Sequence, residues 1–209
     1  MRLFELLLML LPASSVLAQD SLTEVVPGRR VGPVRPSSTA ASLRALLGPL
    51  KAQPADLDIG EGFTEPGLIL FSTDSSRRAS VYWRDTLALE HPAGVLISDA
   101  ATRWRLPLDL TVGTSLQDLE RLNGRPFTFI GLAWDYGGRV SSWNGGSLEE
   151  AFGPTFHFHP SLSAACPELV SAEEYSQIVG DREVSSAHPV ARAACVRVAE
   201  LWIAIDPPP

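Results

Sequence analysis

The densest collection of ligand-type side chains is the segment GLAWDYGGRVSSWNGGSL at residues 131–148. Aromatic rings beside a carboxylate and an amide are typical of surfaces that recognise proteins or carbohydrates. We therefore assign as candidate ligand-binding residues Trp134, Asp135, Tyr136, Trp143 and Asn144.

The same segment also has a purely structural interpretation. Its paired glycines, at 137–138 and 145–146, supply the positive φ angles that tight hairpin turns need. Trp134 and Trp143 would then lie near each other across two strands, where aromatic pairs stabilise a sheet by up to about 1 kcal/mol. The sequence leaves both interpretations open, and the exposure of the tryptophans decides between them.

His157 and His159 are the residues best suited to metal chemistry. They alternate with phenylalanines, so a strand would direct both imidazoles to one side, and neutral imidazole is a common metal ligand. A metal-assisted or carbohydrate-directed hydrolase would add a distant carboxylate such as Asp135. No further ligand motif lies beside the pair, which favours a solvated strand face, and we expect no metal and no cofactor.

The acidic segment DLDIGEGFTE occupies residues 56–65. Gly60 and Glu61 break the order of a calcium-binding loop, so the segment is better read as a strand entering an acidic turn. The sequence also lacks Gly-x-Ser-x-Gly, His-Glu-x-x-His and a Gly-rich phosphate loop. These observations favour a non-enzymatic protein, and no catalytic residue is assigned.

The two cysteines, Cys166 and Cys195, indicate one disulfide if the protein is exported. The alternative is a pair of separate buried thiols. Export is expected because residues 1–18 have the charged start, short apolar stretch and small-residue cleavage site of a signal peptide. That stretch is too short to span a bilayer, so we expect a soluble periplasmic or secreted bacterial protein that does not insert into the membrane after cleavage.

The formal net charge of −7 argues against nucleic acid, whose phosphates need a basic face. It argues equally against binding to an anionic membrane surface. The expected partner is another envelope protein or a carbohydrate.

A pattern of helix, glycine and β-rich segment occurs twice. Aligning Gly48 with Gly124 pairs Leu43 with Leu119, each on the apolar side of a short helix. Apolar runs separated by polar turns follow each helix and predict antiparallel strands. They lie at 67–71, 79–84, 93–98, 127–134 and 139–143.

These elements predict an α+β protein. Two helix-plus-meander repeats would build one antiparallel sheet with the short helices on one face, followed by a disulfide-stapled C-terminal extension. The expected segments are a signal peptide at 1–18, an irregular lead-in at 19–36, repeats at 37–105 and 106–152, and the extension at 153–209, with residues 30–206 forming one globular unit.

Residues 112–148 resemble a family of exported bacterial proteins without an established activity. The resemblance rests on Gly-Thr-Ser-Leu, Leu-Asn-Gly-x-x-Phe, Trp-Asp-Tyr-Gly-Gly and Trp-Asn-Gly-Gly. More loosely, the tandem plan is similar to β-lactamase-inhibitor-protein modules and to small outer-membrane assembly lipoproteins, which implies a binding or scaffold role by fold analogy. The sequence therefore predicts a binding or scaffold module, with a hydrolase or a purely structural envelope protein as the alternatives.

Overall fold

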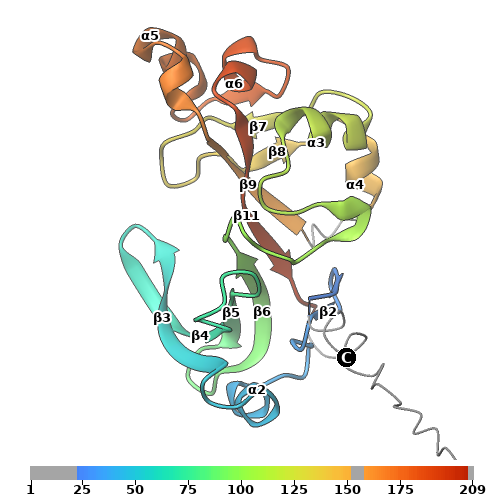
Figure 1. The fold of residues 1–209 in the computed structure, drawn as a ribbon, viewed down its shortest axis with the longest axis vertical. Helices are drawn as coiled ribbons and strands as arrows, with labels where there is room; N and C mark the ends of the chain where they lie inside the picture. The colour runs from blue at the N-terminus through green and yellow to red at the C-terminus, as the bar shows by residue number, and fades with distance from the viewer. Residues whose placement is uncertain (1–22, 152–157, 207–209) are drawn as a thin grey trace, which may run out of the picture.

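The computed structural model describes residues 23–151 and 158–206 (Figure 1). Its main sheet has six strands in the order β3-β4-β5-β6-β11-β9, and every neighbouring pair is antiparallel. These strands are β3 (Ala52–Gly60), β4 (Phe63–Leu70), β5 (Ala79–Asp85), β6 (Glu90–Ile97), β9 (Phe158–Ala164) and β11 (Val196–Ala204).

The remaining strands form two smaller sheets. One has the order β10-β7-β8 and the other pairs β1 with β2. Their bounds are β1 (Val25–Val26), β2 (Arg30–Val31), β7 (Thr128–Ile130), β8 (Val140–Ser142) and β10 (Glu183–Ser185). The helices are α2 (Ala40–Leu47), α3 (Leu116–Asn123), α4 (Ser147–Ala151), α5 (Ala172–Tyr175) and α6 (Pro189–Ala193), with short 3-10 turns η1 (Pro107–Asp109), η2 (Pro167–Leu169) and η3 (Ser176–Ile178).

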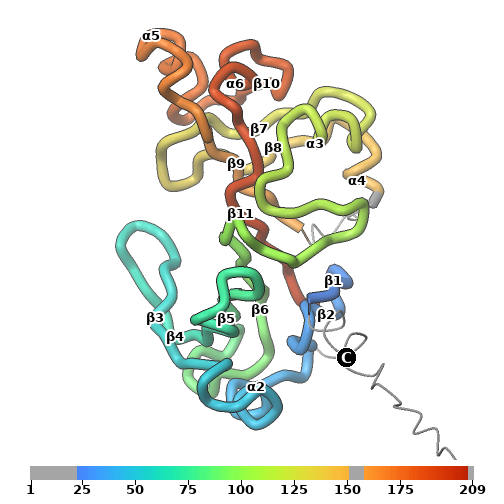
Figure 2. Tube along the Cα trace, in the orientation of Figure 1, coloured from blue at the N-terminus to red at the C-terminus, as the bar shows by residue number. Residues whose placement is uncertain are grey.

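The long strand β11 connects the two ends of the molecule. Its first part pairs with β9 alone, and its last part, from Leu201 to Ala204, lies between β6 and β9. The tube in Figure 2 shows β11 running from the end that carries α6 and β7 toward the end that carries β5 and β6. The two ends consequently share one backbone ladder.

Local sequence explains where the two repeat helices begin and end. The hydroxyl of Thr39 accepts the amide of Ser42 at the start of α2, and Ser115 accepts the amide of Asp118 at the start of α3. Gly124 ends α3 in the left-handed conformation, at φ 75°. The apolar sides of these helices are buried through Leu43 in α2 and Leu119 in α3.

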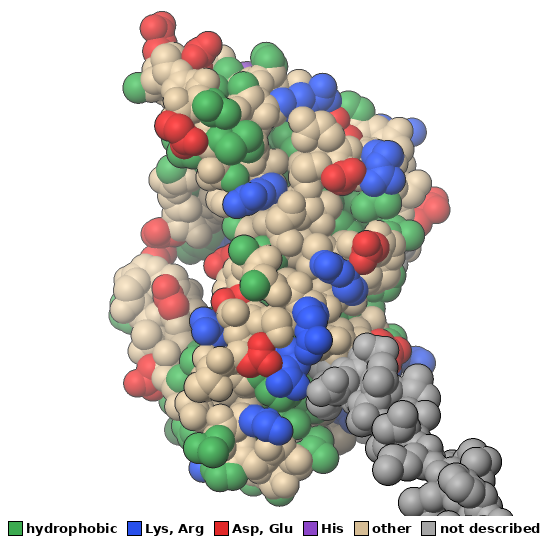
Figure 3. All heavy atoms as spheres, viewed as in Figure 1, with side chains coloured by type: hydrophobic (Ala, Val, Ile, Leu, Met, Phe, Trp, Pro, Cys, Tyr) green, Lys and Arg blue, Asp and Glu red, His purple; other side chains and the backbone are tan. Residues whose placement is uncertain are grey.

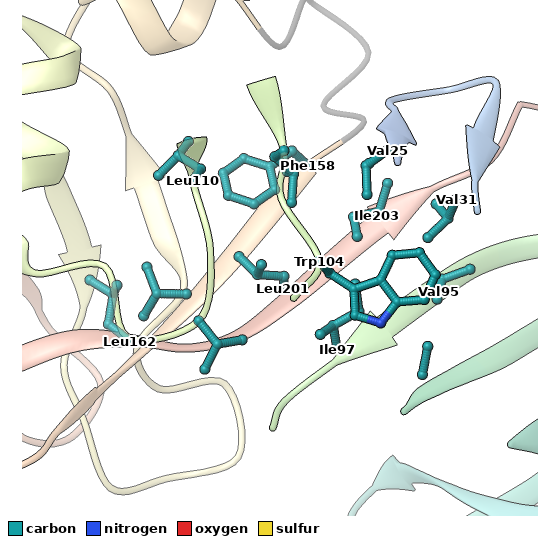
Figure 4. Packing of buried hydrophobic residues seen from close by; sticks show 14 of the residues in the cluster. Val25, Val31, Val95, Ile97, Trp104, Leu110, Phe158, Leu162, Leu201 and Ile203 are labelled. Carbon is teal, nitrogen blue, oxygen red and sulfur yellow. The ribbon is translucent and has the colours of Figure 1, made fainter. Parts of the chain in front are cut away.

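The hydrophobic core runs through both ends of the molecule. Trp104 is fully buried near its middle, and its indole nitrogen donates a 3.0 Å hydrogen bond to the carbonyl of Arg77. In Figure 4 the ring lies against Val95 and Ile97 of β6, while Leu201 of β11 lies beside them. Burying such side chains is the main stabilising contribution to the fold.

The predicted α+β class and antiparallel pairing are confirmed. The strands are distributed differently from the simplest two-repeat plan, because β7 pairs with β8 and β10 in a separate sheet instead of extending the first meander. The C-terminal segment supplies β9 and β11 to the main sheet, so it is integral to the fold. No helix among the described residues is long and apolar enough to cross a membrane, and the predicted signal peptide lies outside those residues.

Candidate functional site

The segment at residues 131–139, here called the aromatic loop, connects β7 to β8. Its backbone is fixed against β9, since the amide of Leu162 donates a 2.8 Å hydrogen bond to the carbonyl of Gly138. A Cβ atom on Gly138 would lie 2.0 Å from the Leu162 carbonyl oxygen, and φ is +77°. Glycine is therefore required at this close approach.

Two aromatic side chains stand on the surface of this loop. Trp134 is 37% exposed and Tyr136 is 48% exposed, and their rings meet edge to face at 5.5 Å. The indole nitrogen of Trp134 donates to the carbonyl of Gly131 at 3.0 Å, which fixes the ring orientation. The guanidinium of Arg139 lies 5.4 Å from the Tyr136 ring centre. The rings are thus held in place by the loop and remain accessible.

The aromatic loop touches the turn at residues 58–63, here called the hairpin tip, which joins β3 to β4. The Tyr136 hydroxyl donates a 3.2 Å hydrogen bond to the carboxylate of Glu61, across 75 positions of sequence. In the tip, Ile59 is 54% exposed and Phe63 is 65% exposed. Figure 3 shows an opening between the hairpin and the body of the molecule.

The base of the hairpin tip is tied to the main sheet. The amide of Gly60 donates to the Asp58 carboxylate at 2.8 Å, and the Tyr82 hydroxyl donates to the Asp58 carbonyl at 2.9 Å. Burial raises the pKa of Tyr82 to about 12, and the negative charges of Asp58, Glu200 and Glu65 add to the shift. The surroundings of this hairpin are therefore acidic.

The second tryptophan of the motif has a different role. Trp143 is buried at 4% exposure, with its ring 4.9 Å from that of Phe127. The expectation that Trp143 belongs to a contact surface is therefore wrong, because the ring fills the core. Trp134 and Trp143 also have different aromatic partners and do not form the cross-strand pair that the sequence suggested.

Asn144 and Asp135 are both exposed. Asn144 has φ 55°, and its side-chain amide donates to the carbonyl of Pro126 at 3.1 Å while its oxygen accepts from Ser142 at 3.2 Å. These bonds make Asn144 a turn residue on the side of the molecule where α3 ends. Asp135 lies between the two exposed rings in sequence. The predicted set therefore separates into three exposed loop residues, Trp134, Asp135 and Tyr136, and two structural residues, Trp143 and Asn144.

The alternative metal site is only partly within the described residues. His157 lies outside them, whereas His159 is exposed on β9 opposite Trp202. Among residues 23–151 and 158–206, no three His, Cys, Asp or Glu side chains gather as a metal site would require.

The cysteines lie close together where β9 ends and β11 begins. The amide of Cys166 donates to the carbonyl of Ala194 at 3.1 Å, which places the two cysteines on adjacent chain segments. Both are thiols in the structure and both are partly exposed. A hydrogen bond with the Cys195 thiol raises the pKa of Cys166, and burial adds to the shift. The predicted pairing is therefore compatible with the observed contact.

A surface pocket of about 370 Å³ lies away from the aromatic loop, between η1 and α3. Its charged side chains pair with one another, Arg105 with Asp109 at 3.3 Å and Arg121 with Asp118 at 2.9 Å. The neighbouring guanidinium and the Ser115 hydroxyl lower the pKa of Asp118. The paired charges leave the pocket without a net preference for an anion or a cation.

Sequence reasoning missed the contribution of the hairpin tip. The sequence feature that could have indicated it is the position of Ile59 and Phe63 in an acidic turn, where apolar side chains are expected to remain exposed. Comparisons with family models, with curated proteins and with solved structures found no match to the chain. Function is therefore inferred from the geometry of the described residues.

Proposed function

We propose that the chain is an exported, non-enzymatic binding module whose recognition surface combines the aromatic loop with the hairpin tip. The observation that carries the proposal is the hydrogen bond from Tyr136 to Glu61. It brings the exposed rings of the loop beside a turn that also exposes large apolar side chains.

The composition of this surface is that of a protein-recognition site. Trp and Tyr dominate binding energy at protein interfaces, and exposed apolar groups rimmed by polar ones mark such sites. The surface offers Trp134, Tyr136, Ile59 and Phe63, each at least one-third exposed. Because Trp134 is anchored to Gly131 and Tyr136 to Glu61, little side-chain freedom would be lost on binding.

The charges around the surface indicate the chemistry of the partner. Asp58, Glu61 and Asp135 are exposed carboxylates of the two segments, against one guanidinium from Arg139. Complementary charge speeds and selects association. The proposed partner is therefore a protein of the cell envelope that presents basic side chains, and a carbohydrate is the competing class of ligand.

The test is capture followed by measured binding. The full chain, as exported by its host, is cross-linked in envelope extract, and each captured protein is purified and titrated against the chain. Trp134→Ala/Tyr136→Ala and Glu61→Lys should each weaken binding at least tenfold. The matched control is Leu169→Ala, because Leu169 is 67% exposed but belongs to η2.

Two results would contradict the proposal. One is a partner that binds wild type and Trp134→Ala/Tyr136→Ala equally. The other is retention of the chain on a glycan array, lost in the same double variant, with no protein captured; that result would replace the protein partner with a carbohydrate. Circular dichroism of every variant confirms that the fold is intact before binding is compared.

A further inference from the structure

The charges of this acidic chain are strongly segregated. Residues 25–55 contain five Arg and Lys and no Asp or Glu, although the whole chain has 24 acidic and 17 basic residues. The basic residues in this stretch are Arg29, Arg30, Arg35, Arg44 and Lys51. Net charge alone hides this basic region, which includes α2 and the strands before it.

Two leucines of this stretch and one leucine of a neighbouring turn are exposed, and the three are here called the leucine end. Leu46 is 68% exposed, Leu50 is 78% exposed and Leu87 is 98% exposed. Leu87 belongs to the turn between β5 and β6, and that turn contacts α2 because the amide of Ala40 donates a 2.9 Å hydrogen bond to the carbonyl of Leu89. Figure 3 shows hydrophobic and basic side chains gathered at the end of the molecule where Figure 1 places α2.

The leucines of this end are presented by fixed backbone and do not fill the core. Leu43 is the α2 leucine that packs inward, at 1% exposure. The Asp85 carboxylate accepts the amides of Leu87 and Ala88 at 3.0 and 2.8 Å, which fixes the turn. That carboxylate and Glu90 are the acidic groups flanking the turn, whereas Arg44 and Lys51 are exposed close in sequence to Leu46 and Leu50.

We infer that the leucine end docks on an anionic lipid surface. Separate protruding leucines between basic side chains suit the boundary of headgroups and acyl chains, where apolar tips enter and cationic heads meet phosphates. Protein interfaces rely on aromatic anchors, and leucine is under-represented among them. Arg30 is ion-paired with Glu24, and the other four basic residues of 25–55 supply the charge complementarity with anionic lipid that selects this occupant. Each basic residue near such a surface strengthens binding about fivefold.

This inference is independent of the proposed recognition surface. α2 lies at one end of the molecule, and the aromatic loop lies beside β7 and β8 in the other part (Figure 1). Docking by the leucine end would leave the aromatic loop and the hairpin tip accessible to a partner. Trp134→Ala/Tyr136→Ala should consequently bind vesicles as wild type does, so the two proposals can fail separately.

The experiment is co-sedimentation of the full chain with vesicles of phosphatidylglycerol and phosphatidylcholine, compared with vesicles of pure phosphatidylcholine. Wild type should bind the anionic vesicles at least tenfold more tightly and lose that advantage in 0.5 M salt, a condition in which charges are screened within about 4 Å. Leu46→Ser/Leu50→Ser/Leu87→Ser and Arg44→Glu/Lys51→Glu should each weaken binding at least tenfold. Every variant keeps residues 1–22 unchanged, so any contribution of that segment to vesicle binding is the same in all of them.

Leu169→Ser is the matched control, since it removes an equally exposed leucine from η2. It should bind as wild type does. Equal binding of wild type to both vesicle types, or wild-type binding by the triple leucine variant, would overturn the inference. Concentration-dependent dimers in ultracentrifugation that the triple variant abolishes, without any binding to vesicles, would also overturn it and assign the leucine end to contact between copies.

Discussion

The buried side-chain amide of Asn123 donates a 2.8 Å hydrogen bond to the backbone carbonyl of Trp143. It also donates to the carbonyl of Arg125 at 3.0 Å, and its oxygen accepts the amide of Leu148 at 3.2 Å. A Cβ atom on Gly146 would lie 2.1 Å from that oxygen. The Leu-Asn-Gly and Trp-Asn-Gly-Gly motifs are therefore two halves of one structural unit.

Asn123→Ala should lower the free energy of unfolding by about 2–3 kcal/mol, because it leaves buried backbone groups without partners. Urea denaturation followed by circular dichroism measures the change. Asn144→Gly is the control: glycine tolerates the positive φ of this exposed turn, so the expected loss is about 1 kcal/mol or less. If Asn123→Ala were as stable as Asn144→Gly, the motif would not have this structural role.

Substitution of the two tryptophans of the motif should destabilise the fold by very different amounts. Trp143→Ala removes a buried ring and should destabilise the fold by about 3–5 kcal/mol. Trp134→Ala removes a partly exposed ring and should cost about 1 kcal/mol, the worth of its contact with Tyr136. Denaturation midpoints of the two variants, compared with wild type, decide whether Trp143 is structural and Trp134 is available for binding.

Local signals predicted much of the fold. The apolar spacing of α3 placed Leu116 and Leu119 in the core, and Gly124 ended the helix as expected from its sequence. The apolar runs before and after polar turns became β4, β5 and β6. These elements are specified by nearby residues, so their patterns are visible in the sequence.

Long-range contacts determined the rest. Trp134 and Trp143 have similar neighbours in sequence, and only the packing of Trp143 on Phe127 and the bond from Asn123 distinguish them. The contact between Tyr136 and Glu61 joins segments 75 positions apart. No periodicity records such a pairing, so the sequence could indicate exposed apolar residues in the hairpin tip but not the contact of the tip with the aromatic loop.

Tyr82 should make stability depend on alkaline pH. The pKa of its phenol is raised to about 12 in the folded chain, whereas an unfolded tyrosine ionises near pH 10. A raised folded pKa gives stability that is fully present below about pH 10 and is lost as pH rises through 12. Urea denaturation between pH 9 and 12 should show this decline, and Tyr82→Phe should lack it. An unchanged profile in Tyr82→Phe would assign the decline to other groups.

Cys166 and Cys195 should form an intramolecular disulfide when the chain is exposed to oxidant. Their side chains already contact each other, and the bond would close a loop that stabilises the fold by about 3–4 kcal/mol in the chain-entropy model. Intact-mass measurement should show the loss of two hydrogens and no thiol labelling, and reductant should lower the unfolding midpoint of wild type. Cys166→Ser/Cys195→Ser is the control, because reductant should leave its midpoint unchanged. Two thiols that remain reactive in the exported protein would refute the disulfide and weaken the proposal of export.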